Sequence, residues 1–289
     1  MLHCTQISVA PWKKTFEDHL IKTGGTSAEF TIASVTASGL PSARMCMYRG
    51  FWGTLPKNKH NQLPKNPDIY ESDCPVFVTD ARMSKVYDVF ATGKAKGDLA
   101  QSRSGSGGGG PIEAVFWFKD TKVQWRMRGK CWIMAADDIE GEDDRQNSEA
   151  ITVRSEVSRF MRIREGSHYT ERNKDWSWRQ EIENIFENLS PMMRGSFKNP
   201  PPRQPLLQGK DEQSGEALGQ TAGHLSEENL ARKNFRVAII APEQVEALHL
   251  SDAAKPTRQI WTLAEEAGNP GGDQQRKSIG KWTKVDTWP

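Results

Sequence analysis

The sequence predicts an α+β fold in which an antiparallel sheet, built from hairpins, forms a barrel covered by a layer of helices. Two observations support this prediction. Residues 112–118 and 123–134 are strand-like, and the four residues between them are typical of a tight antiparallel hairpin. Further strand-like segments follow near the end of the chain, whereas helical periodicity is confined to a few stretches. A sheet of consecutive hairpins with few helices is typical of barrels.

The first half of the chain mixes short helices and strands. In residues 11–22 the apolar residues Trp12, Phe16 and Leu20 stand four apart, which predicts a helix with one buried face. A Ser-Gly turn separates the first two strands, so these strands are expected to pair as a hairpin. The elements that follow the first helix are three strands and a helix, at residues 29–36, 43–51, 75–79 and 82–90.

The second half adds two helices and four C-terminal strands, separated by polar segments. The helices are expected at residues 148–163 and 175–189, and the strands at residues 235–241, 245–250, 259–263 and 281–288. Three segments, one of them containing SRSGSGGGG, lack the large apolar side chains that a core needs. We therefore expect one domain over residues 1–289 with flexible insertions at about 93–111, 137–147 and 208–228.

Composition excludes several classes of protein. The 39 basic and 37 acidic residues give a net charge of +2, without the basic excess that is usual in nucleic-acid-binding proteins. The four cysteines form no CxxC pair, and the scattered histidines show no metal-ligand spacing, so no metal site is expected. Neither a signal peptide nor a membrane span is indicated. A cytoplasmic protein is the expectation.

The chemistry concentrates where a predicted strand meets a predicted helix, in FVTDARMSK. The GxSxG, Walker A, HExxH and GxGxxG motifs are absent from the chain. At this junction Thr79, Arg82, Ser84 and Lys85 surround the N-terminal end of a helix, where free N–H groups favour a phosphate. The same residues would also fit an ordinary helix start with a solvated basic face. The residues alone leave both interpretations open.

Several motifs resemble the pyridoxamine 5'-phosphate oxidase-like flavoproteins when they are taken in order. They are PSARMCMYRGF, FVTDARMSKV, the VFWF and VQW hairpin, MMRGSF, NFRVAIIAPEQVEALHL with RQIW, and the final VDTWP. The resemblance is strongest to a divergent branch of cyanobacteria and fungi. It implies an FMN-binding split β-barrel, antiparallel and Greek-key-like with peripheral helices. It also implies a homodimer that binds FMN at its interface and acts on a small-molecule substrate, without nucleic acid or membrane.

The resemblance also implies roles for individual residues. Cofactor contacts are expected from Arg44, Met45, Cys46, Met47, Thr79, Arg82, Ser84, Lys85, Gln124 and Arg258, some of them from the partner subunit. Arg49, Arg194 and Ser196 are expected to contact the substrate. Departures from the family pattern are Leu248 in place of a flavin-stacking Trp, and Ala254 and Pro256 in place of an R-x-H pair. Side chains of Ala and Pro offer a substrate phosphate no hydrogen bond.

These observations favour an FMN-dependent oxidoreductase whose catalytic residues are unknown, because hydride chemistry belongs to the cofactor. The missing R-x-H pair puts oxidation of pyridoxamine phosphate in doubt. A flavin-binding module or carrier without turnover fits the same residues. A third alternative is a split barrel that binds haem or a deazaflavin.

Overall fold

The computed structural model describes residues 8–23, 28–93, 105–140, 148–167, 175–205, 225–265 and 279–289. Its helices are α1 (Lys13–Lys22), α2 (Ser84–Ala91), α3 (Ser148–Ser158), α4 (Trp178–Glu187), α5 (Pro191–Ser196) and α6 (Leu225–Asn234). Its strands are β1 (Glu29–Val35), β2 (Pro41–Met47), β3 (Tyr70–Ser72), β4 (Val76–Asp80), β5 (Gly107–Phe118), β6 (Val123–Met134), β7 (Met161–Ile163), β8 (Phe235–His249), β9 (Thr257–Glu265) and β10 (Ile279–Thr287).

Most strands belong to one antiparallel sheet with the order β10-β9-β8-β6-β5-β1-β2, and β4 pairs with the first part of β8. The chain just after β2 reaches the start of β4, because Arg49 N–H donates to Val76 O and Val76 N–H donates to Gly50 O, both at 2.8 Å. The strands β1, β2, β4, β8, β6 and β5 therefore surround one core. The body of β2 forms no ladder with β4 among the described residues, so the wall is split there.

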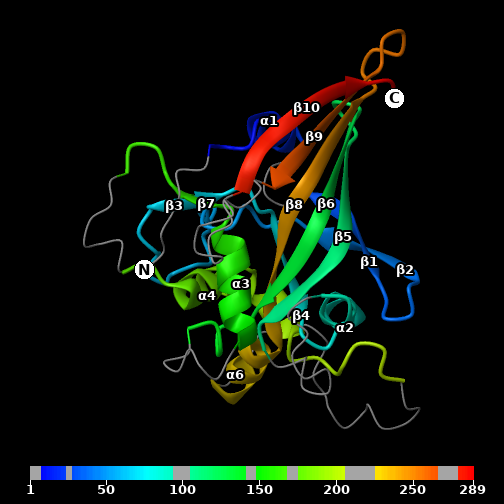
Figure 1. Cartoon of the computed structure of the whole chain (residues 1–289). Helices are drawn as coiled ribbons and strands as arrows, with labels where there is room; N and C mark the ends of the chain where they lie inside the picture. The colour runs from blue at the N-terminus through cyan, green and yellow to red at the C-terminus, as the bar shows by residue number, and fades with distance from the viewer. Residues whose placement is uncertain are drawn as a thin grey trace, which may run out of the picture.

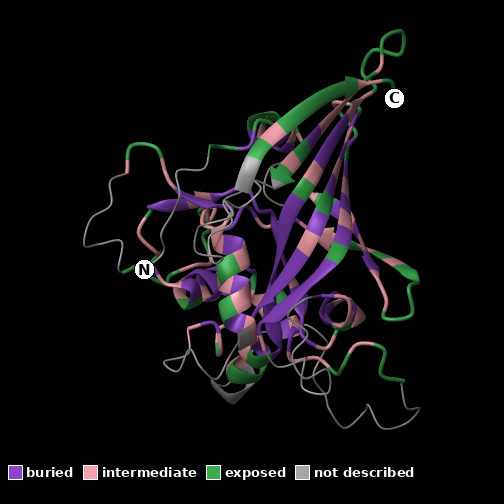
Figure 2. Cartoon of the chain, viewed as in Figure 1, coloured by how far each residue is buried: buried purple, intermediate pink, exposed green. Residues whose placement is uncertain are grey.

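This arrangement confirms the antiparallel split β-barrel. Beyond the barrel, β9 and β10 lie alongside the long strands β8, β6 and β5 (Figure 1). Burial alternates along β5 and β6, so each strand has one covered face and one partly open face (Figure 2). Two of the predicted site residues, Gln124 and Arg258, lie on this open face.

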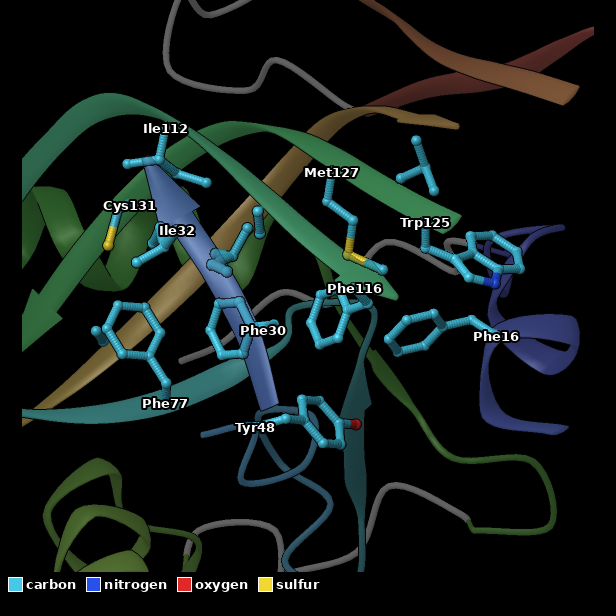
Figure 3. Close-up of a cluster of buried hydrophobic side chains, with 14 of the residues drawn as sticks. Phe16, Phe30, Ile32, Tyr48, Phe77, Ile112, Phe116, Trp125, Met127 and Cys131 are labelled. Atoms are coloured by element: carbon cyan, nitrogen blue, oxygen red, sulfur yellow. The ribbon is translucent and has the colours of Figure 1, made fainter. Parts of the chain in front are cut away.

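Aromatic side chains fill the barrel, and α1 covers one end of it. Phe16 of α1 meets Phe116 of β5 and Trp125 of β6 edge to face, with ring centroids 5.1 and 5.4 Å apart (Figure 3). Phe30 of β1 stacks on Phe116 at 4.7 Å. Burying one such side chain stabilises the fold by about 1.5–3 kcal/mol. The predicted amphipathic helix is thus confirmed, with its apolar side in the barrel.

A second core lies outside the barrel, between the sheet and the helices. Its residues come from α3, α4, β7, the loop after β2 and the first half of β8. Trp52 stacks on Trp178 with centroids 5.3 Å apart, and Phe197 packs edge-on against Phe235 at 5.2 Å. This second core holds the segment after α5 against β8. That segment forms one wall of the candidate site.

The glycine run corrects one prediction from the sequence. The interpretation of residues 93–111 as a flexible insertion is wrong for residues 105–111, which lead into and begin β5 and are largely buried. Gly109 has φ +85°, and a Cβ there would lie 2.4 Å from the Trp132 ring. A Cβ at Gly110 would lie 2.6 Å from the Val89 carbonyl oxygen of α2. Because Gly109 and Gly110 have no side chain, the start of β5 can pack closely against Trp132 and α2.

Some element boundaries also differ from the prediction. The helix expected at residues 148–163 ends at Ser158, and Met161–Ile163 forms β7, which pairs with β3. The strands expected at residues 235–241 and 245–250 are one strand, β8, whose register with β6 shifts beside Pro242. Residues 94–104, 141–147 and 206–224, which include most of the expected insertions, lie outside the described residues. No described helix is long and apolar enough to cross a membrane.

Candidate functional site

A cavity of about 390 Å³ lies at the split in the barrel wall. Three parts of the chain form it, namely β2 with Arg49 just beyond it, the end of β4 with the start of α2, and the end of α5 with the turn after it. Its lining residues are Met45, Cys46, Met47, Arg49, Val78, Thr79, Asp80, Arg82, Met83, Lys85, Met193, Ser196, Phe197, Asn199, Pro200 and Pro202. The cavity therefore brings together eight of the residues expected to contact cofactor or substrate.

The start of α2 supplies the features of an anion site. The helix begins at Ser84, no side chain caps it, and its first turn contains no acidic residue. The Lys85 ammonium donates to Thr79 Oγ1 at 3.1 Å and has no carboxylate oxygen within 4.0 Å among the described residues. Burial lowers the pKa of Lys85, and the charge of Arg44 acts in the same direction. A bound phosphate would raise the pKa of Lys85 and so offset both effects, because it adds negative charge beside this lysine.

Arg49 is a second cation in the lining of the cavity, and no described carboxylate pairs with it. It follows β2, and its backbone holds the barrel together through Val76. Its Nε is buried and has no hydrogen-bond partner in the described part of the chain. Burial lowers the pKa of its guanidinium. A buried donor without an acceptor costs about 1–3 kcal/mol, so an anionic group in the cavity would stabilise Arg49.

Two other predicted cations are already paired. Arg44 donates to Ser34 Oγ at 2.7 Å and forms an ion pair with Asp88 of α2 at 3.3 Å. Arg82 forms a two-pronged pair with Asp80, at 2.9 and 2.6 Å. Both arginines lie near the start of α2. Their charges are largely balanced by these carboxylates.

The β2 residues that line the cavity differ in burial. Met45 is 62% exposed, whereas Cys46 packs partly against the barrel core. Burial raises the pKa of the Cys46 thiol, which keeps it protonated at neutral pH and makes it a poor nucleophile. The edge of β2 that faces the split forms no strand ladder, so its backbone groups can contact a ligand in the cavity.

Gln124 and Arg258 lie elsewhere, on the open face of the sheet. Across neighbouring strands, Trp117 of β5 pairs with Gln124 of β6, Gln124 with Leu248 of β8, and Leu248 with Arg258 of β9. Directly paired residues in an antiparallel sheet share a face. These four side chains therefore form one row, in which Trp117 is 50% exposed.

This row does not line the cavity of its own chain, since neither Gln124 nor Arg258 is among the lining residues. One chain thus does not bring the two groups of predicted residues together.

Of the residues expected to contact the substrate, Arg49 and Ser196 line the cavity and Arg194 does not. Ser196 lines the cavity, and its hydroxyl donates to Met193 O at 2.7 Å. Arg194 does not line it, because its guanidinium pairs with Glu187 and lies over the Phe186 ring. Ser84 is the first residue of α2, adjacent to the lining. Ala254 lies exposed in the turn between β8 and β9.

The sequence did not predict most of the wall formed after α5. Phe197, Asn199, Pro200 and Pro202 all line the cavity. The run of three prolines at residues 200–202 was a usable signal, since it ends the helix and stiffens the chain that follows. Their place beside β2 depends on long-range packing against β8, which no local pattern reveals.

A larger cavity of about 490 Å³ lies between α3, β6, β8 and β9. Each basic residue in its lining has a carboxylate partner: Arg128 with Glu113, Lys130 with Glu243, and Arg159 with Glu156. The smaller cavity contains two cations without such partners. We therefore place the candidate site in the smaller cavity.

The fold and the cavity define a split barrel with an anion site at its opening. Residues 9–135 match the family model of the pyridoxamine 5'-phosphate oxidase FMN-binding domain. This part of the chain is an FMN-binding domain of that family, and its cofactor is FMN. The match includes β2, β4 and α2, which carry the cationic part of the cavity.

One solved structure supports the same fold. A pyridoxamine 5'-phosphate oxidase-related, FMN-binding protein from Nostoc punctiforme PCC 73102 is 18% identical, with a TM-score of 0.54, and the alignment covers 98% of this chain and 100% of that one. PhzG from Burkholderia lata 383, in complex with tetrahydrophenazine-1-carboxylic acid, is 10% identical, with a TM-score of 0.39 and coverage of 98% and 99%. No curated protein matches the sequence. The sequence-based predictions of fold and cofactor are confirmed.

Proposed function

We propose that the protein is an FMN-dependent oxidoreductase that works as a homodimer. The observation that carries this proposal is the cavity at the barrel split, where Lys85 and Arg49 face one space and no described carboxylate pairs with either of them. One cation suits the cofactor phosphate. The other remains for an anionic group on a substrate.

In the proposed complex, Thr79, Ser84 and Lys85 hold the FMN phosphate at the start of α2. Free N–H groups of the first helical turn add to the positive field. The open edge of β2, at residues 45–47, lies along the flavin. When bound, the flavin supplies a hydride acceptor, while the protein orients the ring and excludes water.

We infer the homodimer from the position of Gln124 and Arg258. Neither residue lines the cavity of its own chain, so their proposed flavin contacts require a second subunit. The open face that carries them includes the exposed Trp117 and Val285. Exposed apolar side chains on one sheet face favour association with a second copy.

The proposed substrate carries an anionic group that meets Arg49, with Ser196 beside it. Pyridoxamine phosphate oxidation is not part of the proposal, because Arg194 is paired with Glu187 and Ala254 and Pro256 replace the family's R-x-H pair. The second candidate is a flavin carrier without turnover. It is favoured because Asp80, the acidic residue of the described lining, is paired with Arg82 and the described lining contains no histidine.

Reduction of the bound flavin separates these two functions. The purified full-length protein is loaded with FMN and mixed anaerobically with NADPH, NADH or pyridoxamine phosphate in a stopped-flow instrument. An oxidoreductase loses flavin absorbance near 450 nm at a rate that saturates with the reductant. Stable FMN binding without reduction by any of the three would support the carrier. Absence of flavin binding would contradict both.

A further inference from the structure

We propose that Arg82 is a positioning residue that holds the wall of the cavity formed after α5, and that it is not a ligand of the FMN phosphate. This inference rests on the proposed function, since it concerns the same cavity. It assigns to Arg82 a role different from that of its neighbour Lys85.

The guanidinium of Arg82 donates hydrogen bonds to both carboxylate oxygens of Asp80. Its Nε donates to Asp80 Oδ1 at 2.9 Å and its Nη2 donates to Oδ2 at 2.6 Å, while its backbone N–H also donates to Oδ1 at 2.8 Å. The Asp80 side chain is 8% exposed. A two-pronged pair at these distances fixes the plane of the guanidinium. The carboxylate also balances the charge that a phosphate would otherwise attract.

The same guanidinium contacts the wall of the cavity formed after α5. Arg82 Nη2 donates to the carbonyl oxygen of Phe197 at 3.2 Å. Asn234 Nδ2 donates to the same oxygen at 2.8 Å, and the carbonyl of Asn234 accepts from Ala81 N–H. The chain at Phe197 is therefore tied twice to the end of β4, once through Arg82 and once through Asn234.

Phe197 is the centre of that wall. Its ring packs in the second core against Phe186 and Phe235. On either side of it, Ser196 and Asn199 line the cavity together with Pro200 and Pro202. Loss of the Arg82 bond would loosen this wall and weaken contacts with the body of a bound flavin. It would leave the phosphate contacts of Lys85 and Thr79 in place.

Fluorescence titration with FMN and riboflavin tests this assignment. Lys85→Ala should weaken FMN binding by about ten- to a hundredfold and spare riboflavin, which has no phosphate. Arg82→Ala should weaken both flavins by the same factor, about tenfold, so that the ratio of the two affinities is unchanged. Arg82→Lys keeps the charge without the two-pronged geometry and should behave like Arg82→Ala. Arg164→Ala, which removes an exposed ion pair with Asp68, is the matched control.

A selective loss of FMN affinity in Arg82→Ala, or rescue by Arg82→Lys, would overturn the assignment. Hydrogen exchange of the flavin-free protein gives a test that needs no ligand. The amides of Lys198 and Asn199, which donate to Gly195 O and Ser196 O, should exchange faster in Arg82→Ala than in wild type or Arg164→Ala. Unchanged exchange would also overturn it. If wild type bound neither flavin, the proposed function would fail, while this measurement would still decide the role of Arg82.

Discussion

The hydrogen bond between Trp125 and His19 gives a sharp prediction about stability. The indole N–H of Trp125, a residue that is 0% exposed, donates to His19 Nδ1 at 3.0 Å and links β6 to α1. Substitution His19→Ala leaves this buried donor without its acceptor, which costs about 2 kcal/mol. For a chain of this size the melting temperature should fall by about 4–8 °C.

A double-mutant cycle isolates this bond from the loss of the imidazole ring. Trp125→Phe removes the donor, so His19→Ala should cost at least about 1 kcal/mol less in that background than in wild type. Urea denaturation followed by circular dichroism gives the four free energies of unfolding. Equal costs in both backgrounds would refute the reasoning. Lys22→Ala, at an exposed position of the same helix, controls for helix propensity.

The same bond makes stability depend on pH, because Nδ1 accepts only when the imidazole is neutral. Burial lowers the pKa of His19, and the charges of His249 and Lys22 lower it further, against an opposing effect of Asp18. Burial also lowers the pKa of His249, and the charge of Lys284 lowers it further. The ring centroids of His249 and His19 lie 6.0 Å apart. A depressed folded-state pKa contributes stability that is present above the unfolded value, about 6.5, and is lost as pH falls below it. His19→Gln should flatten this loss in urea titrations between about pH 7 and pH 5.

Three further predictions concern the cofactor site, the glycine run and the dimer. Ser84→Ala should lower FMN affinity by about tenfold and leave riboflavin binding unchanged in fluorescence titrations; equal losses would indicate general unfolding. Gly109→Ala should destabilise the fold by about 2 kcal/mol or more in urea, because its Cβ meets the Trp132 ring at 2.4 Å, and deletion of residues 101–110 should prevent folding. Trp117→Asp should give a monomer that has lost FMN but retains its circular dichroism spectrum; a flavin-loaded dimer in light scattering would contradict the proposed interface.

Local patterns in the sequence predicted those elements whose side chains repeat regularly. The fourfold spacing of Trp12, Phe16 and Leu20 predicted α1 because a helix brings these positions to one face. The β5–β6 hairpin followed from its short connection and its strand-like flanks. Motif order gave the family and the cofactor. The cytoplasmic location remains a prediction from the sequence alone.

Features that depend on distant partners were predicted poorly. Glycines at residues 107–110 look like a linker in the sequence, but their burial depends on α2 and Trp132. Pro242 suggested two separate strands, whereas pairing with β6 continues past it and pairing with β9 begins at Gln244. In the sequence, the charge on Arg82 favours a phosphate ligand, whereas in the structure Arg82 pairs with Asp80, two residues earlier. Which carboxylate an arginine pairs with depends on how the surrounding chain packs.

The position of the Gln124 row outside the cavity of its own chain has a consequence for genetics as well as for structure. In the proposed dimer, each site combines the cavity of one chain with the row of the other. A chain carrying Lys85→Ala and a chain carrying Gln124→Ala would each form homodimers in which both sites are impaired, yet a heterodimer of the two would contain one undamaged site. Random reassociation of equal amounts should therefore restore about a quarter of all sites, which is intersubunit complementation.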